Sequence, residues 1–223
     1  ALAAARAIVG EERLRSGGLV QAHGTGTPQN RVTESEIMSQ TAQAFGIDSW
    51  PVAALKCYLG HSLGSASGDQ VNATLGTWAS GLIPGITTID ELADDVRQDH
   101  LAFSTRHREI DPEQQAYAVV NSKGFGGNNA SATLLSPAVT HQMLQSRYSA
   151  REWQAWERAN EAVLAQQQCY DDDMIAGTRA PVYNFDHGVL ADSDVALDEH
   201  ELRVGEHRIS LALSSPYEDM KLR

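Results

Sequence analysis

Three loops rich in glycine and polar side chains hold the residues best suited to chemistry. The first is 22–28 and contains His23, the second is 56–61, and the third is 121–129. Imidazole rings and a lysine amine can donate hydrogen bonds or protons to a developing negative charge. Each loop alone also has an ordinary structural interpretation: a hydrogen-bonded histidine, an ion pair across a turn, or a tight turn between strands. The third loop lacks the spacing and the following helix of a dinucleotide-binding fingerprint, so we reject that interpretation.

The order and spacing of the three loops together are far more specific. The chain reads Ala-His-Gly-Thr-Gly-Thr at 22–27, Lys-Cys-Tyr-Leu-Gly-His at 56–61 and Asn-Ser-Lys-Gly-Phe-Gly-Gly at 121–127. This succession resembles the β-ketoacyl-acyl carrier protein synthases of the thiolase superfamily, which condense an acyl thioester with malonyl-acyl carrier protein. The resemblance covers residues 1–137 and implies the C-terminal half of such an enzyme.

The resemblance implies a role for each loop. His23 and His61 would donate from Nε2 to the enolate oxygen that forms when a malonyl thioester loses CO₂, and one such donor is worth about 10²–10³ in rate. Lys56 and Glu34 would form a buried ion pair that orients the histidine loops. The remaining residues would serve the substrate: Thr25 and Thr27 bind the phosphopantetheine arm, Phe125 gates the acyl pocket, Asn121 fixes the third loop, and flanking glycines such as Gly126 let it move. No resident cofactor is implied, because phosphopantetheine arrives on the carrier protein or on coenzyme A.

Four residues depart from the family pattern. Lys123 stands where a first phenylalanine is usual, and Arg31 stands where an aspartate is common. Cys57 and Tyr58 replace residues that are usually small or polar. None of these changes removes a catalytic group, but together they indicate an outlying subfamily and leave the acyl preference open.

The family's nucleophilic cysteine has no counterpart in these residues. In the family it begins a helix far upstream of the first histidine, whereas only 22 residues precede His23 here. Cys57 occupies an ordinary position of the second loop, although the adjacent Lys56 would favour its thiolate, and Cys169 lies beyond the resemblance. We therefore expect the nucleophile on an N-terminal half that accompanies this chain, since the face meant for that half would otherwise be exposed. The opening without Met, inside a helix-like run, is typical of a fragment.

Short strands alternating with helices predict an α/β fold through residue 135. Thr33 and Glu36 fit a capping box at the start of one helix. The stretch 90–99 is interpreted as a solvated acidic segment. We expect helices over 1–15, 33–45 and 69–80, and strands over 19–22, 52–56, 117–122 and 130–135. Together with the resemblance, this pattern predicts a thiolase-like layered fold in which helices accompany a mixed five-stranded sheet.

The sequence changes character after Pro137, so we predict a first domain over 1–137 and an α+β extension over 138–223. We expect one long helix over 142–168, then strands over 182–185 and 195–213, with Gly205-Glu206 as a hairpin turn. Trp153 and Trp156 are interpreted as packing residues that clamp the extension onto the body, with recognition of carrier protein as the alternative. An extension of this kind is similar to that of the longer proteobacterial synthases that start fatty acid synthesis from acetyl-CoA.

Composition restricts the partners and the compartment. A net charge of −12 over 223 residues argues against nucleic acid, which requires clustered Lys and Arg, although a local basic patch for an acidic partner stays possible. Two cysteines are too few for a disulfide framework, which favours a cytoplasmic location. We find neither a signal peptide nor an apolar run of about 18 residues that could span a membrane. The 8 histidines lack tight metal-ligand spacing, so no metal is predicted.

These observations predict a 3-oxoacyl-[acyl-carrier-protein] synthase of fatty acid biosynthesis that works as a homodimer with acyl carrier protein. A non-condensing homologue, either a chain-length factor or a malonyl-acyl carrier protein decarboxylase, is the alternative. The residue at the nucleophile position would separate these two hypotheses. A purely structural or binding module is a third hypothesis, and it predicts that the imidazoles of His23 and His61 lie more than roughly 8 Å apart without a shared pocket.

Overall fold

The computed structural model describes residues 1–124, 126–180, 182 and 186–212. The chain divides into two compact units, Ala1–Glu157 and Arg158–Arg223. The first unit contains a five-stranded sheet in the order β4-β2-β1-β6-β7. Its strands are β1 (Gly18–Gln21), β2 (Trp50–Ala53), β4 (Leu101–Ala102), β6 (Tyr117–Lys123) and β7 (Asn129–Leu135). All neighbouring strands are parallel except β6 and β7, which confirms the predicted mixed sheet of an α/β fold.

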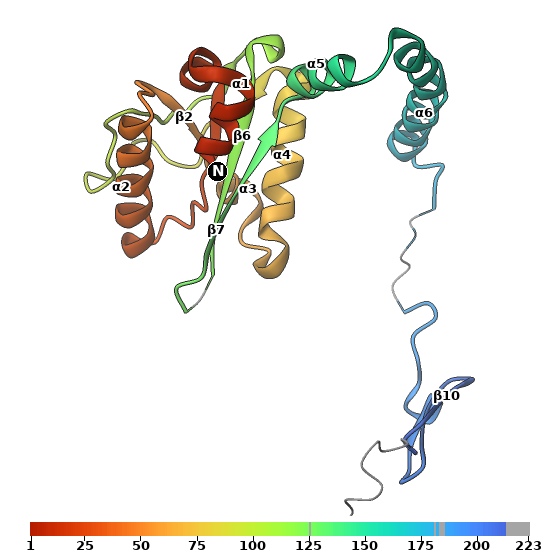
Figure 1. Ribbon diagram of the computed structural model, residues 1–223. Coiled ribbons are helices and arrows are strands. Elements are labelled where there is room, and N and C mark those ends of the chain that lie inside the picture. Colours follow the sequence, from red (N-terminus) through yellow and green to blue (C-terminus); the bar gives the residue numbers. More distant parts are fainter. Residues whose placement is uncertain (125, 181, 183–185, 213–223) are drawn as a thin grey trace, which may run out of the picture. The chain divides into compact units, whose positions relative to one another are not determined.

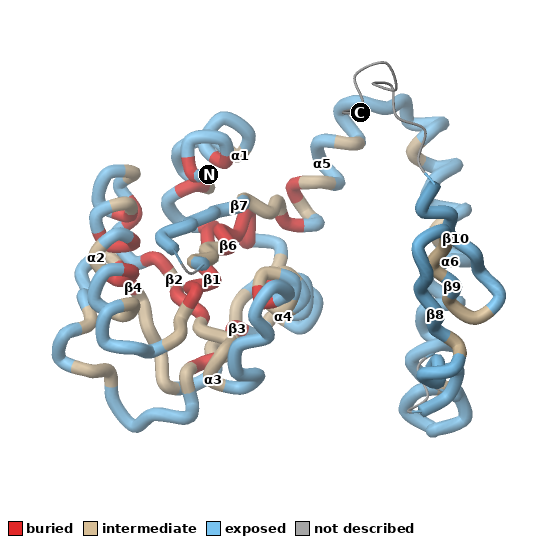
Figure 2. Tube along the Cα trace, turned by 90° about the horizontal axis from the view of Figure 1, so that it is seen from below, coloured by how far each residue is buried: buried red, intermediate tan, exposed pale blue. Residues whose placement is uncertain are grey.

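Helices cover both faces of this sheet (Figure 1). On one face, α1 (Leu2–Ser16) and α2 (Pro28–Ala44) contribute Leu14 and Met38 to the larger apolar core. On the other face, α4 (Ala66–Ser80) contributes Trp78 to a smaller core. Side chains alternate along β1, so Val20 lies in the larger core and Leu19 in the smaller one. The buried residues therefore concentrate along the sheet (Figure 2).

Two glycines shape the entry into the sheet. Gly10 interrupts α1 with a left-handed φ of 81°, so the predicted helix over 1–15 consists of two helical segments joined at a kink. Gly18 begins β1 beneath the ring of Tyr117, where an added Cβ would lie 2.4 Å from the ring. The Tyr117 hydroxyl then donates to the carbonyl of Leu14 at 2.8 Å. The close approach of α1 to β6 therefore requires glycine at position 18.

Two predicted boundaries in the first unit are wrong. Helix α2 begins at Pro28 rather than at Thr33, because proline suits the first helical position, where no N–H is needed. Thr33 consequently lies inside the helix, and its hydroxyl donates to the carbonyl of Gln29 at 2.8 Å instead of capping. Strand β2 ends at Ala53, and the short helix α3 (Lys56–Leu59) replaces the end of the predicted strand.

The predicted long helix over 142–168 is instead two helices, α5 (Pro137–Arg147) and α6 (Ala150–Ala176). The break follows from a capping box that the sequence prediction missed: Glu152 Oε2 accepts the backbone N–H of Ser149 at 2.9 Å, and Ser149 Oγ faces the N–H of Glu152 at 3.4 Å. Trp153 and Trp156 stack with each other, at 4.8 Å between ring centroids, and both contact His141. These rings therefore join α6 to α5.

The predicted domain boundary at 137 coincides with the start of α5, whereas the two compact units meet at residue 157, inside α6. The difference arises because Val139 of α5 is buried in the larger core of the sheet. The boundary between a synthase domain over 1–137 and an extension over 138–223 stays a prediction.

The second unit contains an antiparallel sheet of β8 (Val195–Leu197), β9 (Glu201–Val204) and β10 (His207–Ser210). The predicted hairpin is confirmed, because Val204 pairs with His207 across Gly205-Glu206. Of the strand predicted over 182–185, only residue 182 belongs to the described residues. A further two-stranded sheet in the first unit joins β3 (Leu82–Ile83) to β5 (Arg108–Glu109). Among the described helices, none has the length and apolar character needed to cross a membrane.

Candidate active site

The ends of three parallel strands bring the predicted loops together. Because β1, β2 and β6 run in the same direction, their carboxyl ends open at one edge of the sheet. His23 follows β1, Lys56 begins the helix α3 that follows β2, and Asn121 lies in the last part of β6. The ring of His61, which follows α3, lies 5.2 Å from the ring of His23 between centroids, at an interplanar angle of 76°. The two histidines therefore meet, well inside the separation of roughly 8 Å that a structural module would exceed.

His23 is held at its ring and at both ends of its backbone. Its Nδ1 accepts the N–H of Lys123 at 3.3 Å, its own N–H donates to Glu34 at 2.7 Å, and its carbonyl accepts from Lys56 Nζ at 2.6 Å. The side chain is buried, with 5% of its surface exposed. Burial, and then the nearby charge of Lys56, lowers the pKa of His23 below its ordinary value. The ring is therefore neutral at neutral pH, with its proton on Nε2.

The ring of His61 is held in the same way, from a different loop. Its Nδ1 accepts the N–H of Leu63 at 3.0 Å. The intervening backbone turns sharply: Gly60 and Leu63 both have positive φ, of 71° and 56°. Unlike His23, the side chain of His61 is exposed. A ring that accepts a hydrogen bond at Nδ1 carries its proton on Nε2, so both histidines present the same donor atom.

Glu34 of α2 connects the first and third loops. Its Oε1 accepts the N–H of His23 at 2.7 Å and Nδ2 of Asn121 at 2.6 Å. Its Oε2 accepts the N–H of Gly24 at 2.9 Å and Nδ2 of Asn30 at 2.9 Å. The buried carboxylate is therefore fully occupied by four donors, and it holds the histidine loop against β6.

The predicted direct ion pair between Lys56 and Glu34 is absent from the ion pairs of the described residues. The reason is that neutral donors occupy both oxygens of Glu34, while Lys56 donates to the carbonyl of His23. The two side chains thus hold the backbone of His23 from opposite ends. Burial lowers the pKa of Lys56, and the charge of Glu34 opposes that shift through space.

Asn121 contacts α2 and β7, while its role in fixing the third loop stays a prediction, and Gln70 of α4 is a partner that the sequence prediction missed. Asn121 donates to Glu34 and accepts from Ser131 Oγ at 3.0 Å. Gln70 is buried and its Nε2 donates to the carbonyls of Ala22 at 2.7 Å and of Asn121 at 3.2 Å. It therefore joins the ends of β1 and β6. The available signal was a glutamine on an otherwise small and apolar helix face.

The residues predicted to bind phosphopantetheine lie at the outer part of the first loop. Thr25 is half-buried and Thr27 exposed, and their hydroxyl oxygens lie 3.3 Å apart. Gly126 of the third loop is exposed with φ of 81°, a conformation that favours glycine. Phe125 lies outside the described residues. The substrate roles of these residues stay predictions.

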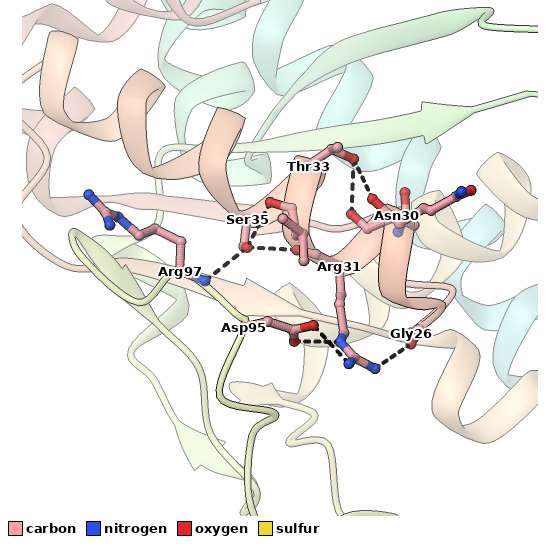
Figure 3. A network of polar contacts seen from close by, with 9 residues as sticks. Gly26, Asn30, Arg31, Thr33, Ser35, Asp95 and Arg97 are labelled. Carbon is pink, nitrogen blue, oxygen red and sulfur yellow. Dashed lines mark hydrogen bonds and ion pairs between the residues drawn. The ribbon is translucent and has the colours of Figure 1, made fainter.

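The acidic segment 90–99 is not simply solvated, because residues of α2 bind it (Figure 3). Arg31 donates from Nε and Nη2 to the two oxygens of Asp95 at 2.6 and 2.9 Å. The N–H of Arg97 donates to Ser35 Oγ at 3.0 Å. Arg31, which departs from the family pattern, thus has a defined partner in Asp95. This pair fixes the segment beside the first loop.

The other departures also have identifiable contacts. The Tyr58 hydroxyl donates to the carbonyl of Gly85 and lies 2.9 Å from Thr87 Oγ1. Lys123 Nζ donates to Thr33 Oγ1 at 3.2 Å. Burial raises the pKa of the Cys57 thiol despite the adjacent lysine, which is the opposite of what an activated nucleophile requires. Cys57 is therefore an ordinary half-buried thiol.

One family model matches the part of the chain that contains the first loop, Glu34 and the second loop. Residues 7–90 match the family described as Beta-ketoacyl synthase, C-terminal domain. The chain is similar to the Beta-ketoacyl-[acyl-carrier-protein] synthase FabY of Pseudomonas aeruginosa, with 43% identity over 211 residues, which are 95% of this chain and 32% of that protein. It is also 31% identical to 3-oxoacyl-[acyl-carrier-protein] synthase 2 of Vibrio harveyi over 114 residues, 51% of this chain and 26% of that protein.

The likeness extends to three-dimensional structure. The crystal structure of the noncanonical ketosynthase FabY from P. aeruginosa matches with a TM-score of 0.78 and 40% identity, covering 99% of this chain and 35% of that one. This match confirms the thiolase-like ketosynthase fold. The chain therefore spans 32% of the length of the FabY relative, and its residues correspond to one part of such a synthase.

Proposed function

We propose that this chain forms the decarboxylation part of a 3-oxoacyl-[acyl-carrier-protein] synthase of fatty acid biosynthesis. The observation that supports this function is the matched setting of two histidines. His23 and His61 lie 5.2 Å apart, each accepts a backbone N–H at Nδ1, and each therefore presents Nε2–H. N–H donors held in place in this way suit the stabilisation of a developing oxyanion.

The reaction requires such donors at one defined moment. When the malonyl thioester loses CO₂, the electron pair of the breaking C–C bond is delocalised onto the thioester oxygen. His23 and His61 stabilise this charge by donation from Nε2, each by about 10²–10³ in rate. The enolate carbon then forms a bond with the acyl carbonyl carbon of a cysteine thioester, and the cysteine thiolate leaves. The depressed pKa of His23 keeps this donor neutral throughout.

The proposal includes several partners outside the chain. Acyl carrier protein would deliver the malonyl group on its phosphopantetheine arm, at Thr25 and Thr27, so no resident cofactor is needed. An N-terminal half of the synthase would supply the nucleophilic cysteine, since burial raises the pKa of Cys57. We place the assembly in the cytoplasm as a homodimer, and two free cysteines are compatible with a reducing compartment.

A non-condensing function is the second candidate, either decarboxylation of malonyl-acyl carrier protein or a role as chain-length factor. The observation that favours it is that the described residues include both proposed enolate donors, while burial raises the pKa of the Cys57 thiol. Release of CO₂ without formation of the 3-oxoacyl product by the purified protein would establish this alternative. Formation of both products would exclude it.

The histidine variants His23→Ala and His61→Ala test both functions. We expect each to lower the rate of CO₂ release from malonyl-acyl carrier protein by about 10²–10³. His200→Ala is the matched control, because the side chain of His200 is 80% exposed and lies in the second unit. Retention of CO₂ release in both variants at the rate of this control would refute the proposed decarboxylation.

A further inference from the structure

A cavity of about 370 Å³ lies beside the candidate active site, and neither histidine lines it. The first loop, α2, the start of α3 and the segment 86–96 surround it. Its volume falls within the range of small-molecule sites, roughly 300–1,000 Å³. Most of its wall is apolar and is formed by Met38, Ile86, Ile89, Leu92, Val96 and Phe103.

Specific contacts hold the outer wall of this cavity in place. Arg31 binds Asp95 with two hydrogen bonds, as Figure 3 shows, and the N–H of Arg97 donates to Ser35. At the other end of the wall, the Tyr58 hydroxyl donates to the carbonyl of Gly85. Arg31 and Tyr58 both depart from the pattern of the family, and both bind the same segment. Side-chain hydrogen bonds therefore hold the outer wall of the cavity at both of its ends.

The charged side chains around the cavity differ in how completely their hydrogen-bonding capacity is used. Arg31 is paired with Asp95, Glu34 accepts four hydrogen bonds, and Glu91 is exposed at the rim. Lys56 is half-buried and has one hydrogen bond, to the carbonyl of His23, whereas its amine has three donors. The cavity therefore combines an apolar wall with one cation whose hydrogen-bonding capacity is incompletely used. A cation in such surroundings favours an anionic partner.

We propose that this cavity binds an aliphatic carboxylate, with the hydrocarbon chain along Ile86, Ile89 and Leu92 and the carboxylate at Lys56. The cavity is distinct from the two histidines, although Thr25, the proposed contact of the phosphopantetheine arm, is among the residues that line it. Lys56 also donates to the carbonyl of His23, and a bound carboxylate would therefore be adjacent to the backbone of the candidate active site.

Calorimetry on the purified protein tests the two parts of the ligand separately. Decanoate has both the chain and the carboxylate, 1-decanol has the chain alone, and acetate has the carboxylate alone. We expect saturable binding of decanoate, and binding of the other two to be weaker by about tenfold or more. Absence of saturable decanoate binding would overturn the proposal. Equal affinity for 1-decanol would also overturn it, because Lys56 would then contribute nothing.

A matched pair of variants tests whether decanoate binds in this cavity. Leu92→Asp introduces a charge into the apolar wall, whereas Leu75→Asp introduces the same charge at a residue of α4 that is 51% exposed. We expect Leu92→Asp to weaken decanoate binding by about tenfold or more and Leu75→Asp to leave it unchanged. Equal weakening, or none in Leu92→Asp, would show that decanoate binds elsewhere and would overturn the assignment.

The unaltered protein provides a second measurement that needs no variant. Cys57 lines the cavity, and Cys169 is an exposed thiol in the second unit. Saturating decanoate should slow the alkylation of Cys57 by iodoacetamide and leave that of Cys169 unchanged, as followed by peptide mass spectrometry. An unchanged rate at Cys57 would overturn the proposal even if Leu92→Asp failed to fold. This readout is independent of CO₂ release, so failure of the proposed function would leave it interpretable.

Discussion

Replacing Glu34 by glutamine should destabilise the protein out of proportion to the small chemical change. The carboxylate accepts two donors on each oxygen: His23 and Asn121 on Oε1, and Gly24 and Asn30 on Oε2. Glutamine replaces one carboxylate oxygen by an NH₂ group, so the two donors that bind that oxygen would face another donor. If the amino group lies toward Asn30, that amide can rotate and present its oxygen, but the N–H of Gly24 stays unpaired. One unpaired buried donor and the loss of a charged acceptor together cost about 2–4 kcal/mol.

Urea unfolding followed by tryptophan fluorescence measures this effect as a change in the free energy of unfolding. Glu36→Gln on the same helix is the control, since its side chain is 43% exposed and reaches Arg97 only at 3.7 Å. We expect the control to lose about 0–1 kcal/mol. A loss below about 1 kcal/mol in Glu34→Gln, or one equal to that of Glu36→Gln, would refute the interpretation of Glu34 as a saturated buried acceptor.

Three further predictions follow from the same contacts. The free energy of unfolding should fall as the pH drops below 6.5, because the folded protein depresses the pKa of His23 and the unfolded state then binds more protons. Urea unfolding at several pH values measures this slope. A slope in the His23→Gln variant equal to that of the wild-type protein would contradict the prediction. Ser149→Ala should lower the stability of α6 by about 1 kcal/mol in thermal denaturation followed by circular dichroism, and an unchanged transition would exclude its role as a cap. Gln70→Leu should lose about 1–3 kcal/mol in urea unfolding, since the carbonyls of Ala22 and Asn121 lose their shared donor; wild-type stability would contradict that role.

The sequence allowed prediction of the chemistry-bearing loops because their local pattern is strong. Small and branched residues identify the strands, and glycine with polar residues marks where each one ends. The parallel arrangement then brings His23, Lys56 and Asn121 to one edge without any further assumption. The side-chain pairing of Lys56 was predicted wrongly, because opposite charge is visible in a sequence while the occupancy of an acceptor is not. Glu34 is filled by backbone and amide donors whose positions depend on the complete fold.

The other differences have two causes, a contact between distant residues and a local signal that was overlooked. The pairing of Arg31 with Asp95 joins residues 64 positions apart, so no local pattern shows that the acidic segment is bound. The break between α5 and α6 was accessible in principle, since Ser149 and Glu152 form a capping-box sequence. There the long run of helix-forming residues on both sides concealed a local signal. For Gln70 the signal was weaker, a glutamine on an otherwise small and apolar helix face, because its three carbonyl partners come together only in the complete fold.

The pairing of Gly18 with Tyr117 has a consequence for how the chain reaches its native state. Strand β1 lies at the centre of the sheet, yet its neighbour β6 is synthesised long after it. Contacts of such large sequence separation form slowly, because a long loop must close before any stabilisation is gained. During synthesis on the ribosome, the apolar edge of β1 therefore stays open until residues 117–123 have emerged, and the histidine loop gains its final geometry among the last parts of the first unit. Chaperone contact with the nascent chain should accordingly be densest over β1 and β2 and should end when β6 docks.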